Sequence, residues 1–196
     1  MAKRIGRDHS LAGELWDSGI HEARILAALV DDPAHVTEEQ METWAADFDS
    51  WDVVDGVCGS LFDRTPFAYE KAAEWSGRQE EFVKRAGFSL MCALAVHDKT
   101  APDDAFRRFL PIIEREAGDP RNYVRKAVNW ALRQIGKRNP TLNREAIDVA
   151  QRIHDTGPRP AGWVASDALR ELRSEAVQAR LSAPVRARRP RRGSRS

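Results

Sequence analysis

The sequence lacks the features that mark secreted, membrane-spanning and redox proteins. No apolar run approaches the roughly 20 residues needed to cross a bilayer, and the N-terminus has no apolar core of the secretory-signal kind. Only two cysteines occur among the 196 residues, Cys58 and Cys92, and their spacing fits neither a zinc site nor a CxxC redox pair. We therefore expect a cytoplasmic protein with reduced, buried cysteines.

Several common catalytic motifs are also missing. There is no glycine-rich phosphate loop, no nucleophile elbow and no zinc motif. The five histidines show no paired metal-ligand spacing, and we expect no metal site. They are His9, His21, His35, His97 and His154.

Charge is unevenly distributed along the chain. The formal net charge is +1, but the segment from Arg180 to Ser196 holds seven arginines and no acid, which leaves 24 basic against 30 acidic residues before it. Residues 181–196 are too polar to build a core, so we predict a domain over residues 1–180 followed by a disordered basic tail. The tail could tether the protein to phosphates, or it could be solvated without a dedicated partner.

The apolar residues repeat at three- and four-residue spacing, which predicts an all-α fold of about ten helices. Thr37 and Gln40 have the spacing of a capping box at one helix start. The segment Glu81–Ala86 can be laid over Asn122–Ala127 at an offset of 41 residues. This period is typical of HEAT or armadillo repeats, so we predict a right-handed, curved α-solenoid whose second helices line the concave face.

Three segments carry side chains suited to chemistry on DNA. Trp51 and Asp55 lie one helical turn apart and share a face, although such a pair is more often a core anchor and a surface acid. The second segment contains Lys84 and Arg85, which could bind phosphate or belong to an inter-repeat ladder of arginines and acids. The third is a basic and aromatic helix that contains Tyr123, Arg125, Lys126, Trp130 and Arg133.

Other tryptophans fit the buried faces of helices. These are Trp16, Trp44, Trp75 and Trp163.

Together, these segments resemble the DNA alkylation repair glycosylase family, whose members are built from HEAT-like repeats. The most specific stretches are His21–Arg24, Ser50–Asp55, Lys84–Ala86 and Arg125–Arg133. The resemblance implies removal of N3- and N7-alkylated purines from double-stranded DNA without a cofactor. It assigns Asp55 as the catalytic acid, Trp51 and Trp130 as the active-site aromatics, and Arg85 as a DNA-contacting residue.

The N-terminal portion is shorter than is usual for that family, and the domain is acidic overall. Duplex binding would then require a stripe of cations on the concave face. The predicted stripe consists of Lys84, Arg85, Arg125, Lys126, Arg133, Lys137 and Arg138.

Two other functions stay open at this point. A non-catalytic HEAT-repeat protein could recognise damaged or branched DNA, and it would bind DNA without releasing a base. A protein-interaction scaffold, a common use of α-solenoids, would have no basic concave stripe. We expect a monomer in the cytoplasm, associated with the nucleoid.

Overall fold

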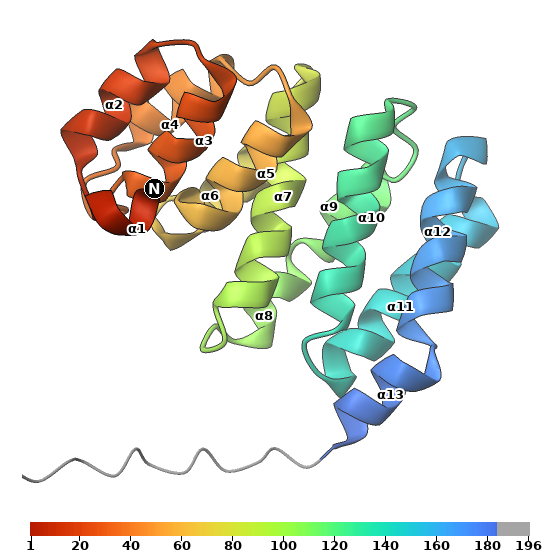
Figure 1. The fold of residues 1–196 in the computed structure, drawn as a ribbon. Coiled ribbons are helices and arrows are strands. Elements are labelled where there is room, and N and C mark those ends of the chain that lie inside the picture. Colours follow the sequence, from red (N-terminus) through yellow and green to blue (C-terminus); the bar gives the residue numbers. More distant parts are fainter. Residues whose placement is uncertain (184–196) are drawn as a thin grey trace, which may run out of the picture.

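The computed structural model describes residues 1–183, which form helices and no strand (Figure 1). The prediction of an all-α fold is confirmed. The helices are α1 (Ala2–Ile5), α2 (His9–Asp17), α3 (His21–Val30), α4 (Glu38–Ala46), α5 (Trp51–Ser60), a 3₁₀ turn η1 (Phe62–Arg64), α6 (Ala68–Trp75), α7 (Glu81–His97), α8 (Asp103–Arg107), α9 (Leu110–Glu116), α10 (Asn122–Gly136), α11 (Pro140–Thr156), α12 (Arg159–Leu172) and α13 (Glu175–Ser182).

Two layers of helices make up the molecule. In one layer, α3, α5, α7, α10 and α12 pack each on the next, while α6, α9 and α11 lie against them from behind (Figure 1). The arrangement is the predicted curved α-solenoid of HEAT-like repeats. Helices α7, α10 and α12 run side by side in one direction, so their first turns lie along the same edge of the layer.

The predicted domain boundary falls inside the last described helix. Leu181 and Ser182 belong to α13, which the sequence assigned to the start of the basic tail. The rest of that tail, residues 184–196, lies outside the described residues.

One continuous core runs between the two layers. Trp16 and Trp44 stack in it with ring centroids 4.0 Å apart, and Trp75 is fully buried. Cys58 and Cys92 are free and buried, as predicted. Trp163 differs from the other predicted core tryptophans because 44% of its surface is exposed.

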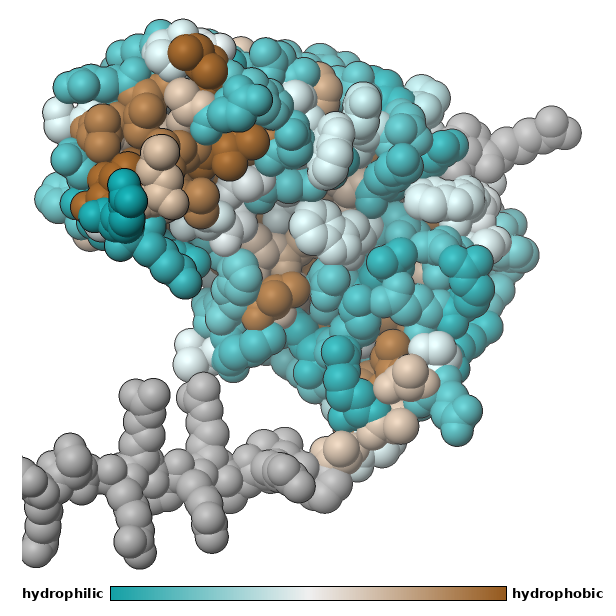
Figure 2. Space-filling view, in the orientation of Figure 1, coloured by the Kyte–Doolittle hydropathy of each residue, from teal (hydrophilic) through white to brown (hydrophobic). Residues whose placement is uncertain are grey.

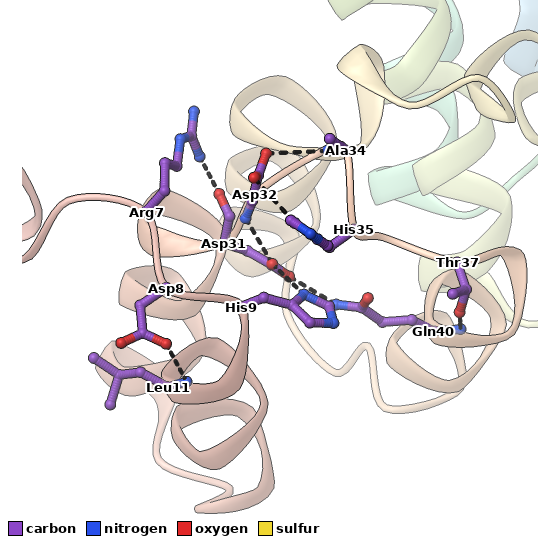
Figure 3. Close-up of polar contacts among 10 residues, drawn as sticks. All are labelled: Arg7, Asp8, His9, Leu11, Asp31, Asp32, Ala34, His35, Thr37 and Gln40. Atoms are coloured by element: carbon purple, nitrogen blue, oxygen red, sulfur yellow. Dashed lines mark hydrogen bonds and ion pairs between the residues drawn. The ribbon is translucent and has the colours of Figure 1, made fainter.

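A buried carboxylate joins the N-terminal helices (Figure 3). Asp31, fully buried after α3, accepts hydrogen bonds from His9 Nδ1, from Gln40 Nε2 and from the Asp32 amide, each at 2.7 Å. Thr37 caps α4 by accepting from the Gln40 amide at 3.1 Å. The predicted capping box is therefore only half formed, because the Gln40 side chain is committed to Asp31.

Helices α6 and α7 approach each other closely at Gly87. A Cβ atom at this position would lie 2.4 Å from the Ser76 amide nitrogen and 2.9 Å from the Trp75 carbonyl carbon. Real side chains do not tolerate such distances to backbone atoms. Gly87 therefore sets how tightly this repeat closes, and with it the position of the first turns of α7.

The exposed surface differs between the two ends of the solenoid. Apolar side chains gather over the N-terminal helices, whereas the surface over the later repeats is mostly polar (Figure 2). Met1, Ile5, Ile20 and Leu29 are the large exposed apolar residues of α1 to α3 and their loops. Within residues 1–183, no helix combines the length and the apolar character that a membrane span requires.

Candidate nucleic-acid interface

Trp51 and Asp55 meet on one face of α5, as their spacing predicted. Trp51 is the first residue of the helix, and half of its surface is exposed. Asp55 follows one turn later, with 20% of its side chain exposed. The pair therefore offers an open aromatic face beside a carboxylate that solvent still reaches.

Arg85 of α7 forms a bidentate ion pair with Asp55. Its Nε donates to Asp55 Oδ1 at 3.1 Å, and its Nη2 donates to Asp55 Oδ2 at 2.6 Å. The Ser89 hydroxyl adds a hydrogen bond to Oδ1 at 2.6 Å. The carboxylate is thus held in one orientation across the α5–α7 contact, since bidentate pairing fixes both groups.

These contacts leave hydrogen-bonding capacity on both partners. Arg85 Nη1 also donates to the Tyr123 carbonyl at 2.7 Å, so three of its five N–H groups are in use and two are free. Asp55 Oδ2 accepts one bond and has a second lone pair available. Only 7% of the Arg85 side chain is exposed, so any contact with a phosphate has to be made from the cavity that Arg85 lines.

A cavity of about 390 Å³ lies on the Arg85 side of this ion pair, and Asp55 itself is not among its lining residues. The Arg85 guanidinium lies 5.9 Å from the ring centroid of Trp51, and Tyr123 packs against Phe82 with centroids 5.5 Å apart. The cavity thus combines aromatic and cationic walls. Its lining residues are Trp51, Arg85, Asn122, Tyr123 and Lys126.

Tyr123, and not Trp130, supplies the second aromatic side chain of this cavity. Trp130 is partly buried, is absent from the cavity lining, and follows Tyr123 by seven residues, which is about 10 Å along α10. The role of Trp130 as an active-site aromatic stays a prediction, and the described cavity does not include it. The internal repeat contained the signal, because it aligns Tyr123 with the aromatic Phe82 at the start of α7.

Lys84 does not belong to the predicted stripe of DNA-binding cations. Its Nζ lies 2.5 Å from Glu116 and 3.0 Å from Asp119, and only 9% of the side chain is exposed. Burial would raise the pKa of Asp119, but hydrogen bonds from Arg121 and Lys84 outweigh burial and hold that pKa well below its usual range. Lys84 therefore ties α7 to the end of α9.

Arg133 and Lys137 also form ion pairs with acidic side chains. Arg133 contacts Asp167 and Glu171 of α12, each at 2.7 Å, and Lys137 contacts Glu171 at 2.5 Å. These are ladder contacts between adjacent repeats, which screen the cations from a phosphate. Arg138 is bound to the Ala95 carbonyl at 2.7 Å. Of the predicted stripe, Arg125, Lys126 and Arg138 have no acidic partner within the described residues, and Arg138 is bound to backbone carbonyls.

The Lys84 cluster carries a prediction about acid stability. Replacing Lys84 with methionine should lower the free energy of unfolding at pH 7 by roughly 1–3 kcal/mol, because two partly buried carboxylates lose a donor. The pKa values of Glu116 and Asp119 are lowered in the folded protein. Their contribution is therefore present above about pH 4 and is lost as the pH falls through the folded values.

Urea unfolding at pH 7 and at pH 3 tests this prediction. The difference in the free energy of unfolding between the wild type and Lys84→Met should be smaller at pH 3 than at pH 7. The exposed control Lys99→Met should differ little from the wild type at both pH values. Equal free energies of unfolding for Lys84→Met and the wild type at pH 7 would mean that these ion pairs do not stabilise the fold.

Within residues 1–183, no three His, Cys, Asp or Glu side chains come together as a metal site would require.

Comparison with known proteins places these observations in a family. A family model described as DNA alkylation repair enzyme matches residues 1–172. One solved structure belongs to "a new family of proteins related to the HEAT-like repeat DNA glycosylases with affinity for branched DNA structures". It matches with a TM-score of 0.71 and 20% identity, over 92% of this chain and 78% of that chain, which shows a shared fold. No curated protein matches the chain.

Proposed function

The chain belongs to the DNA alkylation repair enzyme family, and we propose that it is a DNA glycosylase that releases N3- and N7-alkylated purines from double-stranded DNA. The observation that carries the proposal is the Asp55 carboxylate, held by Arg85 and Ser89 beside the open face of Trp51. A carboxylate and an aromatic face are the groups that a developing sugar cation requires.

The proposed reaction requires little catalytic assistance from the protein. Alkylation at N3 or N7 makes the purine cationic and hence a good leaving group, so catalysis consists of stabilising the oxocarbenium-like sugar as the glycosidic bond breaks. Asp55 supplies negative charge near C1′ of the sugar. The free lone pair on its Oδ2 can orient the water that attacks C1′, and the proton released by that water passes to solvent or to the carboxylate.

Trp51 and Tyr123 enclose the sugar in this proposal. Their ring faces attract the positive charge that develops on the deoxyribose, as in a cation–π contact. Tyr123 takes the role that the resemblance gave to Trp130, since Tyr123 lines the cavity. Trp130 lies further along the same helix and packs partly against the core.

Arg85 would position the DNA through the small part of its guanidinium that lines the cavity. A phosphate bound there lies against the same guanidinium that orients Asp55, so strand position and carboxylate position are coupled. Lys126 lines the cavity and Arg125 lies one residue before it, and both can add phosphate contacts.

A second candidate function follows from the same ion pair. Arg85 neutralises Asp55 formally, and Asp167 and Glu171 offset the cations of α10, so the face has a modest positive charge. The similar solved structure is described as having affinity for branched DNA structures, and a protein that only binds such DNA would need no free carboxylate charge.

One experiment separates the two functions. The protein is incubated with a duplex that contains a single 7-methylguanine and with a four-way junction of the same sequence, and released base and affinity are measured together. Release above the spontaneous rate from the duplex supports the glycosylase. Junction binding without release would replace it by the binding function.

A further inference from the structure

Trp163 is a large exposed aromatic residue outside the cavity described above. It lies in the first half of α12, one repeat beyond Tyr123, with 44% of its surface exposed. Its neighbours Ala161 and Val164 are fully packed into the core, so the backbone that carries the indole is fixed. An exposed apolar ring on a rigid helix is a feature that core packing does not require.

Arg125 of α10 lies over this ring. Its guanidinium carbon is 5.4 Å from the Trp163 ring centroid. Its Nε–H is buried and donates to no acceptor among the described residues. The repeat equivalent of Arg125 is Lys84, which binds Glu116 and Asp119. The structure thus provides acids for the cation of one repeat and an aromatic ring for the cation of the next.

The two helices that carry this pair are locked together. Asn129, one turn after Arg125, donates from Nδ2 to the Val164 carbonyl at 3.0 Å. Arg133, one turn further, is paired with Asp167. Arg125 and Trp163 therefore sit on a fixed α10–α12 seam, at the end that also carries Tyr123.

The spacing of these aromatic side chains favours an unstacked strand over a duplex. Packed helices lie about 8–10 Å apart, so Tyr123 on α10 and Trp163 on α12 are separated by more than the 3.4 Å rise between stacked bases. Bases inside a duplex cannot present their faces to both rings. Unpaired bases of an extended strand can, and a cation beside each ring is suited to the intervening phosphates.

We propose that Trp163 and Arg125 form a binding site for an unpaired nucleotide of single-stranded DNA, with the base stacked on the indole and its phosphate on the guanidinium. The site lies beside the proposed glycosylase cavity, on the same face of the molecule. The inference rests on the proposed function only through this shared face. A single-stranded segment next to a lesion would occupy both.

The test measures affinity for a fluorescein-labelled 15-residue oligo-dT by anisotropy, with the full chain so that the basic tail is the same in every variant. Trp163→Ala should raise the Kd about five- to a hundredfold, as expected for the loss of one base–aromatic stack. Trp163→Phe should restore most of the affinity. Arg125→Met should weaken binding and reduce the slope of log K against log salt by about 0.7.

Controls separate stacking from unfolding and from general charge. Ile20→Ala removes an exposed apolar side chain far from the site, and Lys99→Met removes an exposed cation, so neither should change the Kd by more than about twofold. A blunt duplex should bind Trp163→Ala nearly as well as the wild type. Unchanged oligo-dT affinity in Trp163→Ala overturns the inference, as does an equal loss on blunt duplex.

The same variants keep this inference distinct from the proposed function. If the wild type releases 7-methylguanine but Trp163→Ala binds oligo-dT normally, only the nucleotide site is wrong. If Trp163→Ala loses oligo-dT binding but the wild type releases no base, only the glycosylase is wrong.

Discussion

Replacing Asp55 with asparagine is expected to slow the release of 7-methylguanine from duplex DNA by about ten- to a thousandfold, the range for one electrostatic stabiliser of a transition state. Asparagine keeps the shape of the side chain but removes the negative charge that faces the sugar. Its amide nitrogen would also meet a donor of Arg85, because both Asp55 oxygens accept from that guanidinium. Single-turnover kinetics with enzyme in excess measure the chemical step directly.

Two variants serve as controls. One tests the packing around Asp55 with the Arg85 guanidinium left in place, and the other tests the effect of overall charge. Ser89→Ala removes the hydroxyl bond to Asp55 but leaves the carboxylate and Arg85 in place, so its loss of rate should be smaller than that of Asp55→Asn. Lys99→Met should match the wild type. A rate for Asp55→Asn within twofold of the wild type, at equal thermal stability, would remove Asp55 from the reaction.

Replacing Gly87 with alanine is expected to destabilise the fold by about 3 kcal/mol or more, at the upper end of the range for overpacking. The added Cβ would lie 2.4 Å from a backbone nitrogen of Ser76, which cannot rotate away as a side chain would. Helices α6 and α7 must then separate, which also displaces Arg85. A thermal midpoint roughly 6–12 °C lower follows for a chain of this size.

Gly13→Ala is the matched control for this prediction. Gly13 lies inside α2, and a Cβ there would meet nothing within 4 Å. Alanine should stabilise that helix by about 1 kcal/mol through its higher helix propensity. Equal midpoints for Gly87→Ala and the wild type would show that the α6–α7 approach is not a constraint on folding.

The fold could be predicted from the sequence because its determinants are local or periodic. Apolar spacing marks each helix, and the 41-residue offset that aligns Phe82 with Tyr123 marks the repeat. Trp51 and Asp55 could be placed together because one helical turn separates them. Arg85 was expected at the site from the family resemblance, and the structure joins it to Asp55.

The charge pattern of the concave face could not be predicted in the same way. Whether a cation is free depends on acids about 30 to 35 residues away, such as Asp119 for Lys84 and Asp167 for Arg133. The periodicity of the sequence predicts which face of a helix a residue occupies. It does not predict which side chain of the adjacent repeat that residue contacts. Trp163 shows the same limit, since its spacing fits a buried face and yet its ring lies exposed against Arg125.

In the proposed mechanism, Asp55 and the aromatic walls stabilise a positively charged sugar. The most direct test compares the affinity of the wild type for two duplexes that differ at one site, a cationic pyrrolidine abasic analogue and an uncharged tetrahydrofuran. Transition-state analogues bind at least about a hundredfold more tightly than ground-state ligands, so the account predicts much tighter binding of the pyrrolidine duplex, and a preference that collapses in Asp55→Asn. Equal affinity of the wild type for both duplexes would contradict it.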